Sequence, residues 1–114
     1  MNEDFIKKEI ERLSPWYSTI ELSPGVFTKG YMLRNIALTR ELIRKCDIKG
    51  TKCLDIGTMD AVIPILLKKQ GVSKVIGIDA ANYSNKMPLL KSVYGLDFQY
   101  YGHIAFWLEN RLHS

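Results

Sequence analysis

Hydrophobic and polar positions change period along the chain, and each period predicts a kind of element. Residues 3–13 place Ile6, Ile10 and Leu13 at the spacing of one helix face. Residues 31–47 show the same spacing, with an apolar stripe formed by Met32, Ile36, Leu42, Ile43 and Cys46. We therefore expect two helices in the first half of the chain. The second stripe is expected to be core rather than a cofactor-binding surface.

The stretch between these two helices, residues 16–30, lacks a helical period. Ile20 and Leu22 alternate with polar residues, and Pro24-Gly25 then turns the chain, which predicts a short hairpin or irregular segment. The stretch is also rich in aromatic residues, namely Trp16, Tyr17, Phe27 and, just beyond it, Tyr31. Two interpretations stay open: the aromatic side chains cover one edge of the core, or one of them stacks on a ligand.

The centre of the chain contains short apolar runs separated by glycine turns. The first run begins at about Lys52 and stops at Gly57, which predicts a strand followed by a sharp turn. An apolar helix is expected over residues 61–67. A second strand over residues 75–78 ends at Asp79.

The last third of the chain continues the alternation of helix and strand. Residues 86–95 predict a helix that starts near Pro88, because proline suits a first turn, and stops at Gly95. Residues 96–101 alternate between apolar and polar and predict a third strand. The tail that follows is expected to form a short helix.

The resulting order of elements is helix, hairpin-like segment, helix and then β-α-β-α-β. It predicts an α/β fold with a parallel sheet and right-handed crossovers. The strand over residues 53–56 is nearly all apolar, so we expect it in the middle of the sheet, with a neighbour missing on one side. The 114 residues suffice for a single domain, 1–114, with a helical and hairpin part at 1–50 and a sheet part at 51–114.

Composition narrows the class of protein only a little. The net charge of +4 favours anionic partners, but the bases are spread along the sequence, so a nucleic-acid partner is possible and unsupported. Cys46 and Cys53 form no metal-binding pattern and are expected to be buried and reduced. Neither a signal peptide nor a membrane-spanning run is present. These features predict a soluble, cytoplasmic protein without a membrane partner.

The turn after the first predicted strand contains residues that indicate a ligand-binding site. Gly57 allows a sharp strand-to-helix turn, and Asp60 is a candidate N-cap for the helix that follows. Asp79 lies 22 residues after Gly57, close to the spacing at which an acid in nucleotide-binding βαβ units binds ribose hydroxyls. Met59 stands where a second glycine would admit a pyrophosphate, so a nucleoside ligand without phosphates is favoured.

Two motifs and one longer segment resemble a known family. D-I-G-T-M-D-A (55–61) and V-I-G-I-D (75–79) resemble the first and second motifs of class I S-adenosylmethionine-dependent methyltransferases, with Met59 and Ala61 in place of the second and third glycines. W-Y-S-T-I-E-L-S-P-G-V-F-T-K-G (16–30) is similar to the corresponding segment of enzymes related to the tRNA wobble-uridine carboxymethyl transferases.

The resemblance implies a Rossmann-like cofactor-binding fold and S-adenosyl-L-methionine as the cofactor. It places the methionine part of the cofactor near four residues, Asp55, Gly57, Thr58 and Asp60. It implies that Asp79 binds the ribose and that Ala80 lies against the adenine. It assigns no catalytic residue, because the protein's task in this chemistry is to align the methyl group with an acceptor.

The resemblance also implies that the chain is only part of a domain. Domains of this family have a sheet of about seven strands, whereas three are expected here, so the chain resembles the N-terminal half of a methyltransferase, truncated or split. A second chain or a homo-oligomer would then complete the sheet. The alternatives are a non-catalytic interaction module that uses an exposed sheet edge and, less favoured, a dinucleotide-binding fragment of dehydrogenase type.

Overall fold

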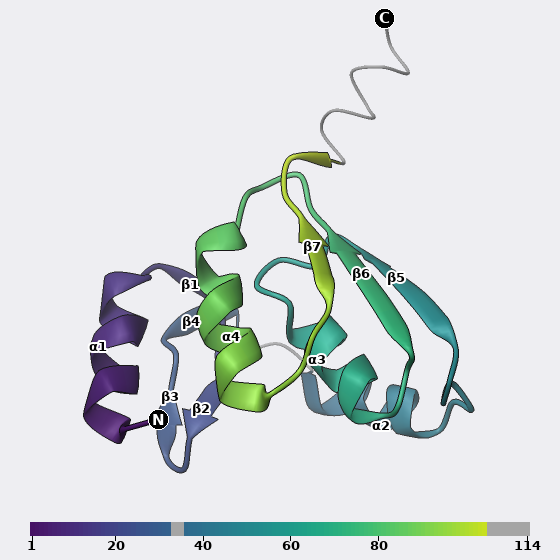
Figure 1. Ribbon diagram of the computed structural model, residues 1–114, viewed down its shortest axis with the longest axis horizontal. Coiled ribbons are helices and arrows are strands. Elements are labelled where there is room, and N and C mark those ends of the chain that lie inside the picture. Colours follow the sequence, from purple (N-terminus) through teal and green to yellow (C-terminus); the bar gives the residue numbers. More distant parts are fainter. Residues whose placement is uncertain (33–35, 105–114) are drawn as a thin grey trace, which may run out of the picture.

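A computed structural model describes residues 1–32 and 36–104 of the chain (Figure 1). Its main sheet has three parallel strands in the order β5-β6-β7. Their bounds are Lys52–Ile56, Lys74–Ile78 and Gln99–Tyr101. The connections are α3 (Val62–Lys69) and a 3₁₀ turn, η1 (Ser84–Lys86), that leads into α4 (Met87–Tyr94). The predicted α/β fold with a β-α-β-α-β parallel sheet is confirmed.

The first helix, α1 (Glu3–Arg12), forms where the helical period predicts it. Asn2 caps it, because its side-chain oxygen accepts the backbone N–H groups of Asp4 at 2.7 Å and Phe5 at 3.3 Å. Ile6 and Ile10 are buried, as the period requires. The helix therefore adds its apolar side to the core.

Four short strands follow α1, and only two of them form the predicted hairpin. The strands are β1 (Trp16–Ser18), β2 (Glu21–Ser23), β3 (Val26–Phe27) and β4 (Gly30–Met32). β2 and β3 pair antiparallel, as expected, whereas β1 and β4 form a parallel pair that the sequence did not predict. This pair needs a residue without a side chain at Gly30, where a Cβ atom would lie 2.2 Å from the carbonyl carbon of Ser18.

Trp16, one of the aromatic residues of this region, is a core residue. Its side chain is 1% exposed, and its indole N–H donates to the backbone oxygen of Ile10 at 2.9 Å. It therefore belongs to the core. Phe27, by contrast, is 50% exposed.

The second helix, α2 (Ile36–Arg44), is shorter than predicted. Its expected first residues form part of β4 instead. Leu42 is 57% exposed and Cys46 is exposed, so the prediction that they belong to the core is wrong. The same holds for the expectation of two buried thiols, since Cys53 is half-buried, although both cysteines are free as expected. The side chains of Met32 and Ile36 lie outside the described residues.

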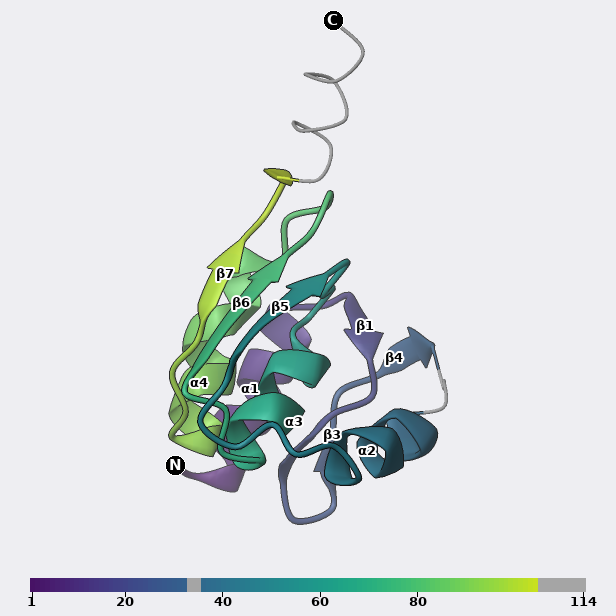
Figure 2. The ribbon, with the colours of Figure 1, turned by 90° about the vertical axis from the view of Figure 1, so that its right-hand side faces the viewer.

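Within residues 1–32 and 36–104, the two crossovers leave one face of the sheet without a helix. Both connections advance in the same direction, from β5 to β6 and from β6 to β7, so right-handed crossovers place α3 and α4 on the same face. In Figure 2 the strands pass in front of α4. Val75 and Gly77 of β6 point to this covered face and are buried.

The opposite face exposes apolar side chains, and we call it the open face. Leu54 is 59% exposed, Ile56 is 69% exposed and Tyr101 is 48% exposed, while Ile76 and Ile78 of β6 are half-buried. β5, which carries the first two, is also an edge strand of the three described ones. The prediction of a central position for this strand is therefore wrong for the described sheet, in which β5 has one free edge.

The predicted ends of the later elements agree with the structure. Pro88 lies in the first turn of α4, and Gly95 ends the helix in the left-handed conformation, with φ of 62°. The third strand covers only the last half of its predicted range. Among the described helices, none is long and apolar enough to cross a membrane. The tail predicted as a helix lies outside the described residues, except for its first three residues.

Candidate nucleotide-binding site

The loop that joins β5 to α3 lies at the carboxyl end of the sheet, where open α/β folds bind ligands. The backbone N–H groups of Gly57 and Thr58 both donate to the oxygen of Ile78, at 2.9 and 3.0 Å. The loop is therefore held against the end of β6. These two amides are therefore not free to bind a ligand. Backbone N–H groups that could bind one remain at the start of α3, where helical amides have no partner within the helix.

The backbone of the loop has left-handed residues at alternate positions. Gly57 has φ of 76°, Met59 of 52° and Ala61 of 67°. Glycine adopts this conformation without strain, whereas other residues do so at a cost. The two non-glycine residues occupy the positions that are glycines in the motif which the sequence resembles. The loop therefore keeps the backbone form of a glycine-rich turn although its sequence does not.

Asp60 has a different role from the predicted helix cap. The residue that precedes α3 is Ala61, and no side chain caps the helix. Instead, Asp60 Oδ2 accepts the backbone N–H groups of Tyr17 at 2.9 Å and Ser18 at 2.8 Å. The Asp60 side chain is fully buried. It therefore joins β1 to the loop, and the N-cap prediction is wrong.

Asp79 braces the same loop from the end of β6. Its Oδ2 atom accepts the N–H of Met59 at 2.7 Å, and its Oδ1 atom accepts the N–H of Ala81 at 2.8 Å. The residue is 4% exposed. The acid is thus next to the loop, as predicted, and both of its oxygens already serve the fold. Each carboxylate oxygen retains a second lone pair.

Asp55 is the remaining predicted acid, and it lies on β5 just before the loop. Burial raises the pKa of its carboxyl, and the negative charge of Asp79 acts in the same direction. The Thr58 hydroxyl opposes the shift without reaching hydrogen-bond geometry. The Asp55 side chain is thus a carboxyl group in an environment that disfavours its charge.

Three buried side-chain atoms at this site lack hydrogen-bond partners. They are Asp55 Oδ2, Thr58 Oγ1 and Asp60 Oδ1, and within residues 1–32 and 36–104 they are the buried side-chain polar atoms without one. An unsatisfied buried polar group costs about 1–3 kcal/mol, so native proteins rarely keep several together without a function. All three belong to a stretch of six residues, which marks this stretch as the candidate site.

Tyrosines line the loop on the side of β7, and the sequence analysis assigned them no role. The Tyr83 hydroxyl donates to the sulfur of Met59 at 3.8 Å, and the Tyr83 N–H donates to the Tyr100 hydroxyl at 2.6 Å. Ala80, predicted to lie against an adenine, is exposed, and its backbone oxygen is 3.1 Å from Nδ1 of His103. For the tyrosines, the only signal in the sequence was the alternation of apolar and polar residues that predicted the third strand, which contains Tyr100.

Lys86 is a second side chain that the sequence did not single out. It is 4% exposed, and its Nζ donates to the backbone oxygen of Leu13 at 2.7 Å while lying 5.1 Å from the centre of the Trp16 ring. Burial lowers its pKa, and the nearby charge of Asp60 opposes this shift. Lys86 therefore joins the start of α4 to the N-terminal region. No group of three or more potential metal ligands lies together within the described ranges.

Comparisons with known proteins show the fold. No protein-family model matches the sequence, and no curated protein matches it. Among solved structures, the chain is similar to the N-terminal domain of EvdMO1, crystallised in the presence of SAH (S-adenosylhomocysteine) and D-fucose, with a TM-score of 0.69 and 17% identity. The match covers 90% of this chain and 45% of that chain, so this chain spans less than half of its neighbour's length. The Rossmann-like fold predicted from the sequence is thereby confirmed.

Proposed function

We propose that this chain supplies part of a binding site for S-adenosyl-L-methionine and belongs to a methyltransferase. The observation that carries the proposal is the group of three unpartnered buried atoms on Asp55, Thr58 and Asp60. The neighbour with the same fold was crystallised in the presence of SAH, which is the product that S-adenosylmethionine leaves after methyl transfer. The sequence resemblance at residues 55–61 and 75–79 supports the same ligand.

The residues of the loop fit the chemistry of this cofactor. Its methionine part carries an ammonium group, which the carboxyl of Asp55 would bind. The positive charge of the ammonium would favour the ionised form of Asp55, which burial disfavours. The Thr58 hydroxyl and the open space beside Gly57, where a Cβ atom would meet nothing within 4 Å, would accommodate the methionine chain. Asp60 is fully buried, so its proposed part is to fix the loop.

The second predicted contact is with the ribose of the cofactor. Asp79 would bind it through the lone pairs that Met59 and Ala81 leave free. Ala80 is exposed beside this carboxylate and would lie against the adenine. The cofactor itself supplies an activated methyl group, and the role of these residues is to bind and orient it.

Within the described residues the proposed site is open on one side. β5 has a free edge among the described strands, and the open face beside it exposes Leu54 and Ile56. The chain could return from β7 and add a further strand parallel to β5 at its free edge. This connection would run in the opposite direction to the first two crossovers. A right-handed crossover would therefore place its helix on the open face. Such a βα unit, from further along the polypeptide or from another chain, would cover both surfaces and form the other side of the ligand crevice.

The finer relationship, to the tRNA wobble-uridine carboxymethyl transferases, rests on residues 16–30. The direct bonds from Asp60 to Tyr17 and Ser18 support a connection between this segment and the site. On this proposal the N-terminal region would help to close the cofactor site.

A non-catalytic interaction module is the second candidate, and the free edge of β5 favours it. Isothermal titration calorimetry separates the two. We expect S-adenosylmethionine and SAH to give a saturable heat with the wild-type chain, and the Asp55→Asn variant to give a weaker one. NAD should give none, because the bulk of Met59 opposes a pyrophosphate. Absence of heat at millimolar cofactor would leave the interaction module as the better account.

A further inference from the structure

The fold gathers positive charge that the sequence spreads out. Residues 40–52 and 68–74 together contain eight of the 16 lysines and arginines but only two of the 12 aspartates and glutamates. These two segments carry a net charge of +6, although the whole chain carries only +4. The remaining residues are therefore net negative, and the charge of the chain is polarised.

Hydrogen bonds hold the two basic segments together. Gly50 donates its backbone N–H to the oxygen of Gly71 at 2.9 Å, and Ser73 donates its N–H to the oxygen of Thr51 at 2.8 Å. Lys52 and Lys74 are paired residues at the start of β5 and β6. We call this region, residues 40–52 and 68–74, the basic end. It lies along the lower edge of the molecule in Figure 1, whereas the Gly57 loop lies at the opposite ends of the strands.

The surface between α2 and α3 is hollowed at the basic end. A hollow of about 270 Å³ there is lined by Arg40, Ile43 and Arg44 from α2 and by Leu66, Lys69 and Gln70 at the end of α3. It forms a groove with an apolar floor and a cationic rim. A second hollow, of about 200 Å³, shares Arg40, Leu66 and Lys69 with it but extends away from the basic end towards Thr19, Glu21 and Val62, and it is not part of the groove.

The cations of this groove are largely uncompensated. Among the described ion pairs, the one at the basic end joins Arg44 to Glu41 at 2.9 Å. Arg40 and Lys69 have no carboxylate within ion-pair distance in the described part of the chain, and the Lys69 ammonium instead lies 4.4 Å from the centre of the Tyr94 ring. Both residues are exposed, so an anion can reach them.

We infer that the basic end binds the phosphate backbone of a single-stranded nucleic acid along the groove between α2 and α3. A nucleic-acid strand carries one charge per nucleotide, so it can contact the cations of the groove and then those of the loops beyond it. A flat anionic membrane does not match a concave surface. An acidic protein would need a complementary shape as well as charge.

This inference is independent of the proposed cofactor site. The two surfaces lie at opposite ends of β5, whose five residues at roughly 3.3 Å each separate them. Binding at the basic end therefore requires neither S-adenosylmethionine nor a further strand beside β5. An assay without cofactor tests it alone.

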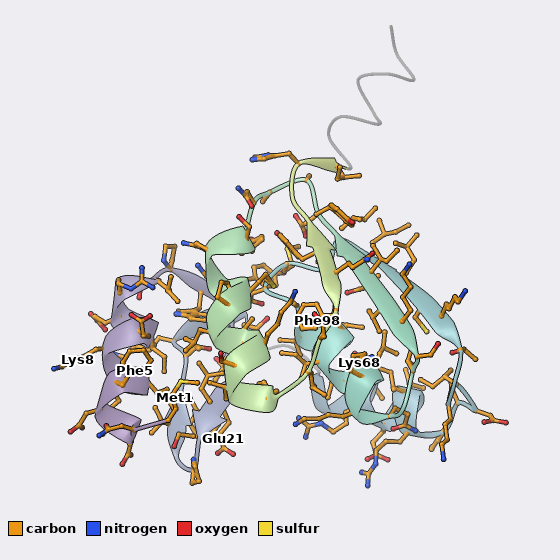
Figure 3. All side chains as sticks on the ribbon, in the orientation of Figure 1. Met1, Phe5, Lys8, Glu21, Lys68 and Phe98 are labelled. Carbon is orange, nitrogen blue, oxygen red and sulfur yellow. The ribbon has the colours of Figure 1, made fainter. Side chains whose placement is uncertain are left out.

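The test is fluorescence anisotropy with a labelled oligouridine of about 20 nucleotides at low salt. Three proteins are compared: the wild type, the double variant Arg40→Gln/Lys69→Gln, and a control, Lys8→Gln/Lys29→Gln, with the same change in charge. Lys8 lies on α1, at the far side of the molecule from Lys68 of the basic end (Figure 3). Circular dichroism establishes that all three fold.

We expect the groove variant to bind about tenfold more weakly than the wild type. The slope of log affinity against log salt concentration should become shallower by about 1.4, which corresponds to two phosphate contacts at about 0.7 each. The control should change affinity less than about twofold. An oligothymidine of equal length should compete as well as oligouridine, because the backbone is what is bound. The inference is overturned if no anisotropy change occurs at about 100 µM protein, or if both variants lose affinity equally. The inference would also be overturned if polyglutamate or phosphatidylserine vesicles displaced the labelled oligouridine at a lower concentration of negative charges than unlabelled oligothymidine does.

Discussion

Asp60 and Ser18 are joined by a hydrogen bond that spans 42 residues of sequence. The backbone N–H of Ser18 donates to Asp60 Oδ2 at 2.8 Å, inside a region where the Asp60 side chain has no exposed surface. The same oxygen accepts the N–H of Tyr17 at 2.9 Å. One carboxylate therefore fixes the N-terminal strands to the loop that carries the proposed site.

Replacing Asp60 with alanine should destabilise the chain by about 3 kcal/mol, because two buried backbone donors would lose a charged acceptor. Urea unfolding followed by circular dichroism measures the change. Asp97 is the matched control, since its side chain is 97% exposed and Asp97→Ala should cost less than about 0.5 kcal/mol. Equal losses in the two variants would show that the bonds of Asp60 contribute little.

Replacing Met59 with glycine should stabilise the chain by about 0.5–1 kcal/mol. Met59 has φ of 52°, and a left-handed conformation costs a residue with a Cβ atom roughly 1–2 kcal/mol, part of which the flexibility of glycine in the unfolded chain offsets. In contrast, Leu38→Gly in α2, at a 58% exposed position, should destabilise by about 1 kcal/mol. Destabilisation in both variants would contradict the left-handed conformation of Met59.

Gly77 and Thr58 should depend on one another. A Cβ atom on Gly77 would lie 2.8 Å from Thr58 Oγ1 and 2.9 Å from Thr58 Cγ2, so Gly77→Ala should cost about 2 kcal/mol by overpacking. Thr58→Ala removes both atoms, and the double variant should therefore be more stable than the sum of the single changes predicts. Thermal unfolding of the four proteins gives the coupling, and strict additivity would argue against this contact.

Local patterns in the sequence predicted the local elements well. The three parallel strands, the helices α1, α3 and α4, and the turns at Gly57 and Gly95 each follow from apolar period and glycine position. Pro64 lies in the first turn of α3, which begins at Val62, and a proline at this position removes no intrahelical bond.

Features that depend on distant residues were missed. The parallel pair of β1 and β4 and the bonds of Asp60 link residues that no short window contains. The apolar stripe of α2 predicted burial, yet Leu42 is exposed because a period reveals an apolar side without revealing what covers it. The same reason explains why the apolar strand β5 was expected in the centre of a sheet.

The raised pKa of Asp55 gives the stability of the chain a specific pH dependence. Because the folded chain holds this proton to a higher pH than the unfolded chain does, stability falls as pH rises from the ordinary aspartate value of 3.8 through the raised folded value. Asp55→Asn removes this fall. The variant should therefore gain free energy of unfolding relative to the wild type as pH rises through this range, and keep the gain at neutral pH.

Urea unfolding at a series of pH values measures this difference. Asp97→Asn serves as the control, because it makes the same substitution at a side chain that is 97% exposed. A wild-type chain that is more stable than Asp55→Asn at neutral pH would contradict the burial argument. Loss of cofactor binding together with a gain in stability is the combination expected of a binding residue.

The open face should cause association of the isolated chain. Ile56 is 69% exposed beside the free edge of β5, so light scattering should show a mass that rises with concentration, and Ile56→Lys should abolish the rise. Phe27→Lys, at a 50% exposed position in β3, should leave it unchanged. A monomer at every concentration would mean that this edge does not pair with a second copy.

The measurement that tests the central proposal most directly is an amide chemical-shift titration of the labelled chain with SAH. The account predicts saturable shifts at millimolar SAH that centre on Gly57, Thr58 and Ala80, and their loss in Asp55→Asn. NAD at the same concentration should leave these amides unmoved. Shifts confined to other regions, or no shifts in a folded chain, would contradict a cofactor site at the Gly57 loop.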